Sequence, residues 1–476
     1  MEEKRKVKIA LCGIGLDAYW DQFAGLRSRL ESCLASTAAM IEQAGGEVLS
    51  LGLVDNSSKA RDAGCVVRRE GASLLVIHVT TYALSSTLLL MLQRANLPVL
   101  LLNLQPDAAL DYARVNGFAD RRAMTGEWLA YCASCTMPEI TNVMQRAGIA
   151  LRQITGIAGS ADVAQELGEW IAAADAVAAL REARIGLMGH YYSGMLDIAT
   201  DLAGVAITFG VEFVEVELEE LVRRRREASE QDVLRRVQEF AASFAGCEDC
   251  APAELARAAR TSFALDALVV DERLDAMAYY ARGSGVAECE DAMSSIIAGA
   301  TLLTATGIPI AGEYEVKNAL AMLILARLGA GGSFTEYYAM DFTLDHVLMG
   351  HDGPGHAAMA EGKIRLRPLE VYHGKVGDGL SVEMSVRHGP VTLLAVAEDG
   401  RGRYRMVVAE GESVAATCLE IGNTNSHYQF ALGARGFVEA WNRAGTAHHC
   451  AVGVGHIAGK LAKVASLLGI EMLQIC

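Results

Sequence analysis

The first 180 residues of this chain alternate short apolar runs with amphipathic stretches, and a second round of the same pattern starts near residue 184. The apolar runs, which we interpret as strands, stand at 7–14, 47–54, 74–79, 99–104, 184–189 and 211–218. Helical patterns fill most of the intervals, and a long charged helix is predicted over 219–245. Such alternation predicts parallel sheets with helices on both faces.

After about residue 360 the sequence changes to alternating apolar and polar residues with the turn signals VGDG and EDGRGR. This pattern predicts an antiparallel β domain. A chain of 476 residues is too long for one core. We therefore expect an α/β protein with two Rossmann-like parallel-sheet domains followed by an antiparallel β-barrel domain. The expected domains are residues 1–182 (N-terminal α/β), 183–334 (central α/β) and 335–476 (β-barrel with a terminal helix).

Composition narrows the function classes. The formal net charge of −16 argues against nucleic-acid binding, which requires clustered basic residues. Residues 71–93 lack charged side chains, but Ser, Thr and His78 interrupt them, so a buried strand and helix fit better than a membrane span. The N-terminus shows no cleavage site typical of a signal peptide. The eleven cysteines follow no disulfide spacing, which indicates reduced thiols and a cytoplasmic protein.

The segment 311–356 contains most of a candidate metal site. It brings two carboxylates, Glu313 and Glu336, and a histidine, His351, into a stretch otherwise rich in apolar and glycine residues. Glu313 ends an apolar strand, where an unpaired buried carboxylate would cost several kcal/mol. About ninety residues later His448 and His449 stand side by side among small residues. Two glutamates with one or two histidines form a ligand set that suits Mn²⁺, Co²⁺, Fe²⁺ or Mg²⁺.

Other interpretations of these residues stay open. The glutamates could cap helices or pair with bases such as Lys317, and a histidine in a Gly/Pro loop is often simply exposed. The cysteine pairs Cys132/Cys135 and Cys247/Cys250 could form a zinc site, although we expect reduced structural thiols. The run GIGLDA after the first strand is a weak dinucleotide fingerprint, because bulky residues crowd the place of a pyrophosphate.

Four motifs in this order resemble the L-arabinose isomerase and L-fucose isomerase superfamily, closest to its arabinose isomerase branch. They are AGE with a Lys four positions after the Glu, SFTEYY, VLMGH, and AHH near the C-terminus. The resemblance implies that Glu313 and Glu336 bind the metal and act as acid/base catalysts. It implies that His351 and His449 are the other two metal ligands, and that His448 contacts the substrate.

The resemblance further implies a metal-dependent aldose-ketose isomerase that acts on a small sugar, such as an L-arabinose-like pentose or an L-fucose-like deoxyhexose, by proton transfer through a cis-enediol. A divalent ion, Mn²⁺ first, and a homo-oligomer, a hexamer or trimer of dimers, are implied as well. We also predict that Met195 and Tyr19 bind substrate. The alternatives are a sugar epimerase or an isomerase of an unusual carbohydrate, a non-catalytic sugar-binding protein and, third, an NAD-dependent enzyme.

Overall fold

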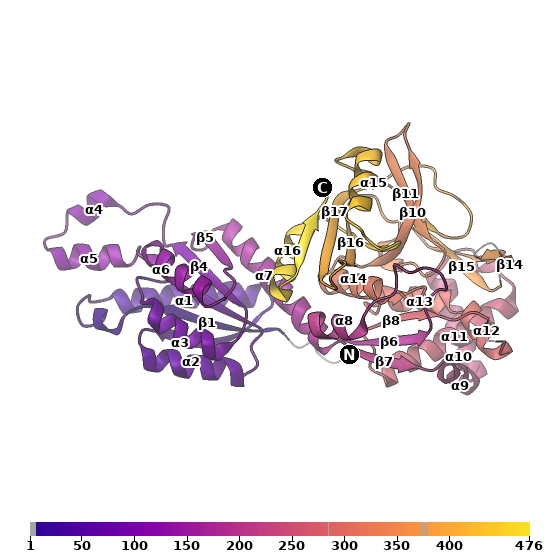
Figure 1. Cartoon of the computed structure of the whole chain (residues 1–476), viewed down its shortest axis with the longest axis horizontal. Coiled ribbons are helices and arrows are strands. Elements are labelled where there is room, and N and C mark those ends of the chain that lie inside the picture. Colours follow the sequence, from indigo (N-terminus) through magenta and orange to yellow (C-terminus); the bar gives the residue numbers. More distant parts are fainter. Residues whose placement is uncertain (1–5, 284, 373–374, 377) are drawn as a thin grey trace. The chain divides into compact units, whose positions relative to one another are not determined.

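The computed structural model describes residues 6–283, 285–372, 375–376 and 378–476. The chain divides into two compact units, Met1–Ala178 and Ala179–Cys476. Both units contain a parallel sheet, and the second also contains the antiparallel strands (Figure 1).

The first unit is built on a five-stranded parallel sheet with the strand order β2-β1-β3-β4-β5. Its strands are β1 (Lys8–Ile14), β2 (Glu47–Val54), β3 (Leu74–His78), β4 (Val99–Gln105) and β5 (Gln153–Ile157). Its helices are α1 (Leu26–Gln43), α2 (Ser57–Arg69), α3 (Ser85–Ala95), α4 (Tyr112–Asn116), α5 (Arg121–Leu129), α6 (Ala133–Arg146) and α7 (Ala161–Glu182). Apolar side chains of α2, α3 and α6 share one core cluster with alternate residues of β1, β3 and β4. This is the doubly wound arrangement predicted from the alternating pattern.

A buried histidine makes the stability of the first unit dependent on pH. His78, at the end of β3, is 3% exposed, and its Nδ1 lies 2.9 Å from the Thr37 hydroxyl oxygen. Burial lowers the pKa of His78 from 6.5 to about 4. In that pH window the unfolded chain binds a proton that the folded chain does not, so stability falls as the pH falls. The full effect is roughly 3 kcal/mol at the lower end.

We expect hydrogen exchange of the β3 amides to accelerate between about pH 7 and about pH 5, after correction for intrinsic exchange rates. The variant His78→Asn should lose this acceleration, because an amide side chain does not titrate there. An equal pH effect in the variant would show that another group is responsible.

One of the two CxxC pairs, the one nearer the N-terminus, differs from the prediction. Cys132 and Cys135 form a disulfide, so the prediction of reduced thiols is wrong for this pair. Their Cα atoms lie 5.5 Å apart at the start of α6, a distance that a disulfide spans. Cys247 and Cys250 are free thiols.

The second unit begins with a four-stranded parallel sheet in the order β7-β6-β8-β9. The strands are β6 (Arg184–Gly189), β7 (Glu212–Val216), β8 (Ala276–Tyr280) and β9 (Ile310–Ala311). The helices around it are α8 (Leu202–Phe209), α9 (Leu218–Glu227), α10 (Glu230–Ser243), α11 (Pro252–Asp271), α12 (Ala287–Ser294), α13 (Ile297–Ala305) and α14 (Val316–Arg327).

The charged segment 219–245 is two helices, not the single helix that was predicted. The break falls between α9 and α10, where Ser229 caps the second helix. Its hydroxyl accepts from the Asp232 backbone N–H, and the Asp232 carboxylate accepts from the Ser229 N–H. This capping box satisfies backbone groups at a helix start, so it favours a new helix over continuation of the old one.

Six antiparallel strands of the second unit close into a barrel. Their order is β16-β19-β10-β11-β18-β17, and β16 pairs again with β17 to complete the ring. The strands are β10 (Ser333–Asp341), β11 (His346–His351), β16 (Gly389–Glu398), β17 (Tyr404–Val414), β18 (Thr424–Phe430) and β19 (Cys450–Val454). The closed ring confirms the predicted fold class of parallel sheets followed by an antiparallel barrel.

Smaller elements complete the second unit. They are β12 (Arg365–Pro368), β13 (Val371–Tyr372), β14 (Lys375–Val376), β15 (Leu380–Glu383), α15 (Gly433–Arg443), α16 (Ala458–Leu468) and β20 (Glu471–Gln474), which runs parallel to β17. The last helix of the described chain is α16. The boundaries drawn at 182 and 334 stay predictions.

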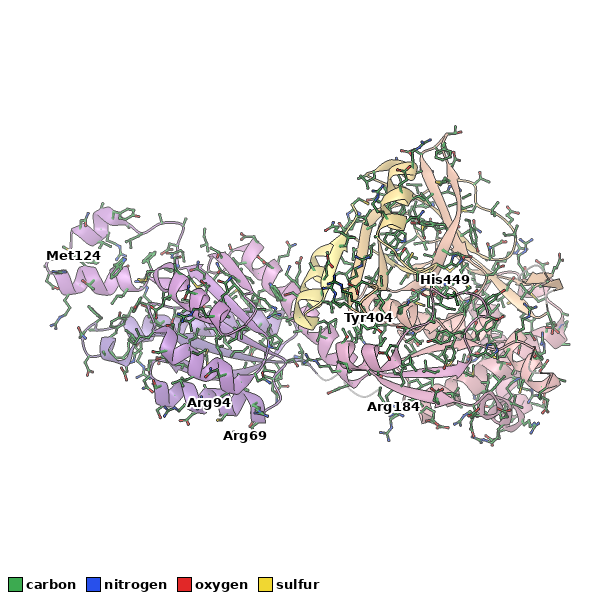
Figure 2. All side chains as sticks on the ribbon, in the orientation of Figure 1. Arg69, Arg94, Met124, Arg184, Tyr404 and His449 are labelled. Atoms are coloured by element: carbon green, nitrogen blue, oxygen red, sulfur yellow. A yellow bond between two sulfur atoms is a disulfide. The ribbon has the colours of Figure 1, made fainter. Side chains whose placement is uncertain are left out.

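Hydrogen bonds join the barrel to the parallel sheet within this unit. Nearly all of α14 is buried, and Asn318 on it donates to the carbonyl of Cys450 on β19. Tyr404 on β17 donates through its hydroxyl to the carbonyl of Asp201, just before α8 (Figure 2). These contacts bring the carboxyl edge of the parallel sheet to the barrel strands. Among the described residues, no helix is both long and apolar enough to span a membrane.

Candidate metal centre

Glu313 stands at the carboxyl edge of the parallel sheet, between β9 and α14. Its backbone and that of Tyr314 have positive φ angles of 55° and 61°, a conformation that costs energy for residues with side chains. The turn is held by the Tyr314 N–H, which donates to Tyr279 at 3.0 Å, and by the Tyr192 N–H, which donates to Glu313 at 3.4 Å. This strained turn places the Glu313 side chain in the interior, where it is 6% exposed.

The barrel supplies the other candidate ligands from three neighbouring strands. Glu336 lies on β10 directly opposite Gly350 of β11, and His351 follows Gly350 at the end of that strand. His449 immediately precedes β19, whose first residue pairs with Thr335. Register therefore brings together three side chains that are far apart in sequence. His351, which could have been an exposed loop residue, is 3% exposed.

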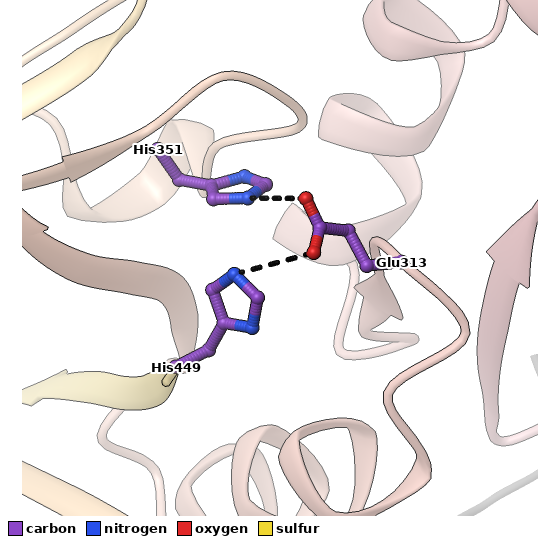
Figure 3. A group of neighbouring side chains, drawn as sticks. All are labelled: Glu313, His351 and His449. Atoms are coloured by element: carbon purple, nitrogen blue, oxygen red, sulfur yellow. Dashed lines mark ion pairs between the residues drawn. The ribbon is translucent and has the colours of Figure 1, made fainter. Parts of the chain in front are cut away.

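The side chains of Glu313, His351 and His449 point toward one another (Figure 3). His351 Nε2 lies 3.9 Å from Glu313 Oε1, and His449 Nε2 lies 3.7 Å from Glu313 Oε2. His449 Nε2 is also 3.8 Å from Glu336 Oε2. His449 thus belongs to two groups of possible metal ligands. One group also contains Glu313 and His351, and the other also contains Glu336 and His448.

These distances fit a bound ion better than direct pairing. They exceed the length of a hydrogen bond, whereas atoms that bind one ion at about 2.1 Å lie roughly 3 to 4 Å apart. His449 Nε2 is buried and accepts or donates no hydrogen bond within the described part of the chain. A buried nitrogen in that position calls for a partner such as a cation. The residues present therefore fit a divalent metal.

A carboxylate behind His449 fixes the orientation of its ring. Glu315 Oε2 lies 2.5 Å from His449 Nδ1, and both side chains are 1% exposed. A carboxylate that accepts from the far nitrogen of a metal-binding imidazole sets its tautomer and raises its basicity. Phe334 packs its ring 4.4 Å from both the His351 and the His449 rings. Sequence reasoning missed both residues, although the second acid in AGEYEVK was a signal for Glu315.

His448 occupies the more open side of the site. Its imidazole pairs with the Glu336 carboxylate, and its backbone N–H donates to Asp197 Oδ2 at 2.6 Å. The hydrogen bond to Glu336 raises the pKa of His448. Burial by itself would raise the pKa of Glu336, but the hydrogen bond from His448 and the nearby histidine charges lower it on balance. Glu336 is therefore held as a carboxylate.

The two other predicted substrate residues differ in position. Met195 lies in the loop after β6, two residues before Asp197, which contacts His448. Lys317 anchors this loop because its Nζ donates to the carbonyl of Asp197 at 2.7 Å. Tyr19 belongs to the first unit, where its ring lies 5.7 Å from Phe23. The substrate roles of Met195 and Tyr19 stay predictions.

Comparison with known proteins gives matches to sugar isomerases. The family model described as the L-arabinose isomerase C-terminal domain matches residues 331–471, which include Glu336, His351 and His449. An L-arabinose isomerase of Nocardioides sp. is 24% identical over 71% of this chain and 68% of its own length. An L-arabinose isomerase of Geobacillus thermodenitrificans is 25% identical over 69% and 68%. A sulfoquinovose isomerase of Alkalicoccus urumqiensis is 26% identical over 55% and 59%.

The fold, the site and these matches define an enzyme of the sugar isomerase class. Within that class the chain is an arabinose isomerase-like protein, and a divergent one.

Proposed function

We propose that this protein is a metal-dependent aldose-ketose isomerase whose ion is bound by Glu313, Glu336, His351 and His449. The observation that carries the proposal is the position of His449 Nε2. It is buried, it faces both carboxylates at 3.7 and 3.8 Å, and its ring is held from behind by Glu315.

The donor set is two carboxylate groups and two imidazoles, which suits Mn²⁺ among the divalent ions, with Co²⁺, Fe²⁺ and Mg²⁺ as alternatives. A divalent ion bound there would act as a Lewis acid on the oxygens of an open-chain sugar. A protein that only binds sugar need not keep two buried histidines and two carboxylates around one point, which weighs against that alternative.

The two carboxylates are the proposed proton carriers. One carboxylate removes the proton from the carbon beside the carbonyl while the acid form of the other protonates the carbonyl oxygen, which gives a cis-enediol. The first then gives its proton to the former carbonyl carbon, and the second takes the proton of the neighbouring hydroxyl, so both groups end as they began. Glu336 suits the first step because its lowered pKa keeps it ionised and it is the less buried of the two. His448, half-exposed and hydrogen-bonded to Glu336, is placed to contact a substrate oxygen.

The proposal covers more than one sugar substrate. The relatives are named for L-arabinose and for sulfoquinovose, so both a neutral pentose and an unusual carbohydrate belong to the proposal. We also propose that the protein has three domains, that it forms a homo-oligomer and that it acts in the cytoplasm.

Metal removal tests the proposal. After exhaustive EDTA treatment we expect isomerisation of four- to six-carbon aldoses and ketoses to disappear, and Mn²⁺ to restore it. Mn²⁺ should also raise the Tm of the wild-type protein, because a ligand that binds only the folded state stabilises it. Full activity in the chelated protein would contradict the proposal, as would an unchanged Tm with Mn²⁺.

A further inference from the structure

A cavity lies at the carboxyl end of β8, the strand next to β9. It has a volume of about 180 Å³, several times the space that a single water requires. Residues from β8 and the following turn, from α12 and α13, and from the segment after β12 line it; among them are Tyr280, Arg282, Glu290, Ser294, Ile297 and Leu369. Neither metal binding nor proton transfer uses these side chains.

The cavity adjoins the reacting centre through the turn that carries Glu313. β8 and β9 are neighbouring parallel strands in which Ala278 pairs with Ala311, two residues before Glu313. The Tyr279 carbonyl accepts from the Tyr314 N–H at 3.0 Å, which ties the wall of the cavity to the residue after Glu313. Burial is the largest cause that raises the pKa of Tyr280. The nearby Tyr192 and the Glu313 and Glu290 carboxylates raise it further. Tyr280 therefore lies within electrostatic reach of Glu313 and of the cavity.

The charges around the cavity do not suit an anion. One guanidinium, Arg282, and two carboxylates, Glu290 and Asp378, line it. Asp378 is already paired with Arg257 at 3.0 Å, and it accepts from the Ser294 hydroxyl at 3.2 Å. Arg257 also pairs with Glu254 and Asp291, so it does not fully offset the charge of Asp378. A sulfonate or phosphate would therefore meet no excess of positive charge in this cavity.

The same lining suits a neutral polyol. A hydroxyl group both donates and accepts, so it can bond to a guanidinium, a carboxylate, a tyrosine or a serine. Ile297 and Leu369 add apolar surface against which the C–H groups of a sugar can pack.

We infer that this cavity receives the end of the sugar chain remote from the reacting carbons, and that it selects neutral aldoses of six carbons or more over shorter or anionic ones. The inference rests on the proposed function and names its substrate class. Binding energy from a remote, unreactive part of a substrate raises the rate at the reacting centre.

Filling the cavity tests the inference. Ala281 is the smallest side chain in the lining, so Ala281→Leu should reduce the space. We expect the ratio of kcat/KM for neutral aldohexoses to that for aldopentoses to fall at least about tenfold in this variant. Arg282→Met should lower the same ratio through lost hydrogen bonds. The matched control is Ala253→Leu, the same change on the exposed start of α11, which should leave the ratio at its wild-type value.

Calorimetry with galactitol and arabinitol on the Mn²⁺-loaded protein provides a readout without turnover. Wild-type protein should bind the six-carbon polyol more tightly, and Ala281→Leu should abolish the difference. If aldoses are isomerised but neither variant changes the ratio, the cavity inference is overturned and the isomerase proposal stands. If the wild-type protein isomerises none of the sugars, the isomerase proposal fails, and the calorimetry still decides on the cavity. Faster turnover of 6-sulfonated than of neutral aldohexose would overturn the inference.

Discussion

Replacing Glu336 by glutamine should lower the kcat for aldose-ketose isomerisation by at least about 10³-fold, because it removes a proton carrier and a metal ligand together. Glu313→Gln should have an effect of the same size. Both changes keep the side-chain volume, and neither removes a large apolar contact, so the fold should survive. The loss comes from chemistry that only a carboxylate can perform, since an amide does not accept a proton at neutral pH.

The measurement is the initial rate with saturating aldose and Mn²⁺, together with the far-ultraviolet circular dichroism spectrum and the Mn²⁺-dependent rise in Tm. Glu439→Gln, an exposed glutamate on α15, is the matched control and should retain the wild-type rate. Wild-type turnover by either of the site variants would remove that glutamate from the mechanism. A normal Tm response to Mn²⁺ without turnover would restrict the residue to proton transfer.

Removing the carboxylate behind His449 should weaken metal binding about 10- to 100-fold, which is the usual effect of losing such a partner. In Glu315→Leu the Nδ1 atom of His449 loses the carboxylate that lies 2.5 Å away, so the ring is free to turn and becomes less basic. Glu315→Gln keeps an acceptor but not the charge, and should lie between the wild-type protein and the leucine variant.

Titration with Mn²⁺, followed by the signal of the free ion in electron paramagnetic resonance, gives the affinity directly. Excess Mn²⁺ should restore much of the activity of Glu315→Gln, because Glu315 touches a ligand rather than the substrate. Unchanged affinity in both variants would show that Glu315 is only a packing residue. Weak binding with no recovery at high Mn²⁺ would indicate a wider distortion of the site.

Much of the fold follows from local patterns. Alternating apolar runs predicted the parallel sheets, because a strand buried on both faces must be apolar throughout. The capping box at Ser229 is present in the sequence as S-x-x-D. The charged periodicity continues across it, however, and by itself predicts one helix. The disulfide between Cys132 and Cys135 was not predicted, since spacing alone does not distinguish a reduced pair from an oxidised one.

The candidate site, like the fold, could be predicted from the sequence only in part. Its ligand types could be identified because glutamate and histidine in apolar surroundings are costly unless something compensates them. Glu315 could not be assigned, because its partner His449 lies 134 positions away and only their contact gives it a role. Phe334 looked like an ordinary core residue, and nothing in the sequence marks the cavity at the carboxyl end of β8.

By itself, the sequence determined most of the secondary structure, the order of parallel sheets and barrel, and the two residue types, glutamate and histidine, that could hold an ion. These depend on local propensity and on the cost of burying charge. The tertiary structure alone decided which atoms face one another. The register of β10, β11 and β19, and the strained turn at Glu313, set the distances of 3.7 to 3.9 Å that fit a metal. Strand register and burial are properties of residues distant in the chain, so no local pattern encodes them.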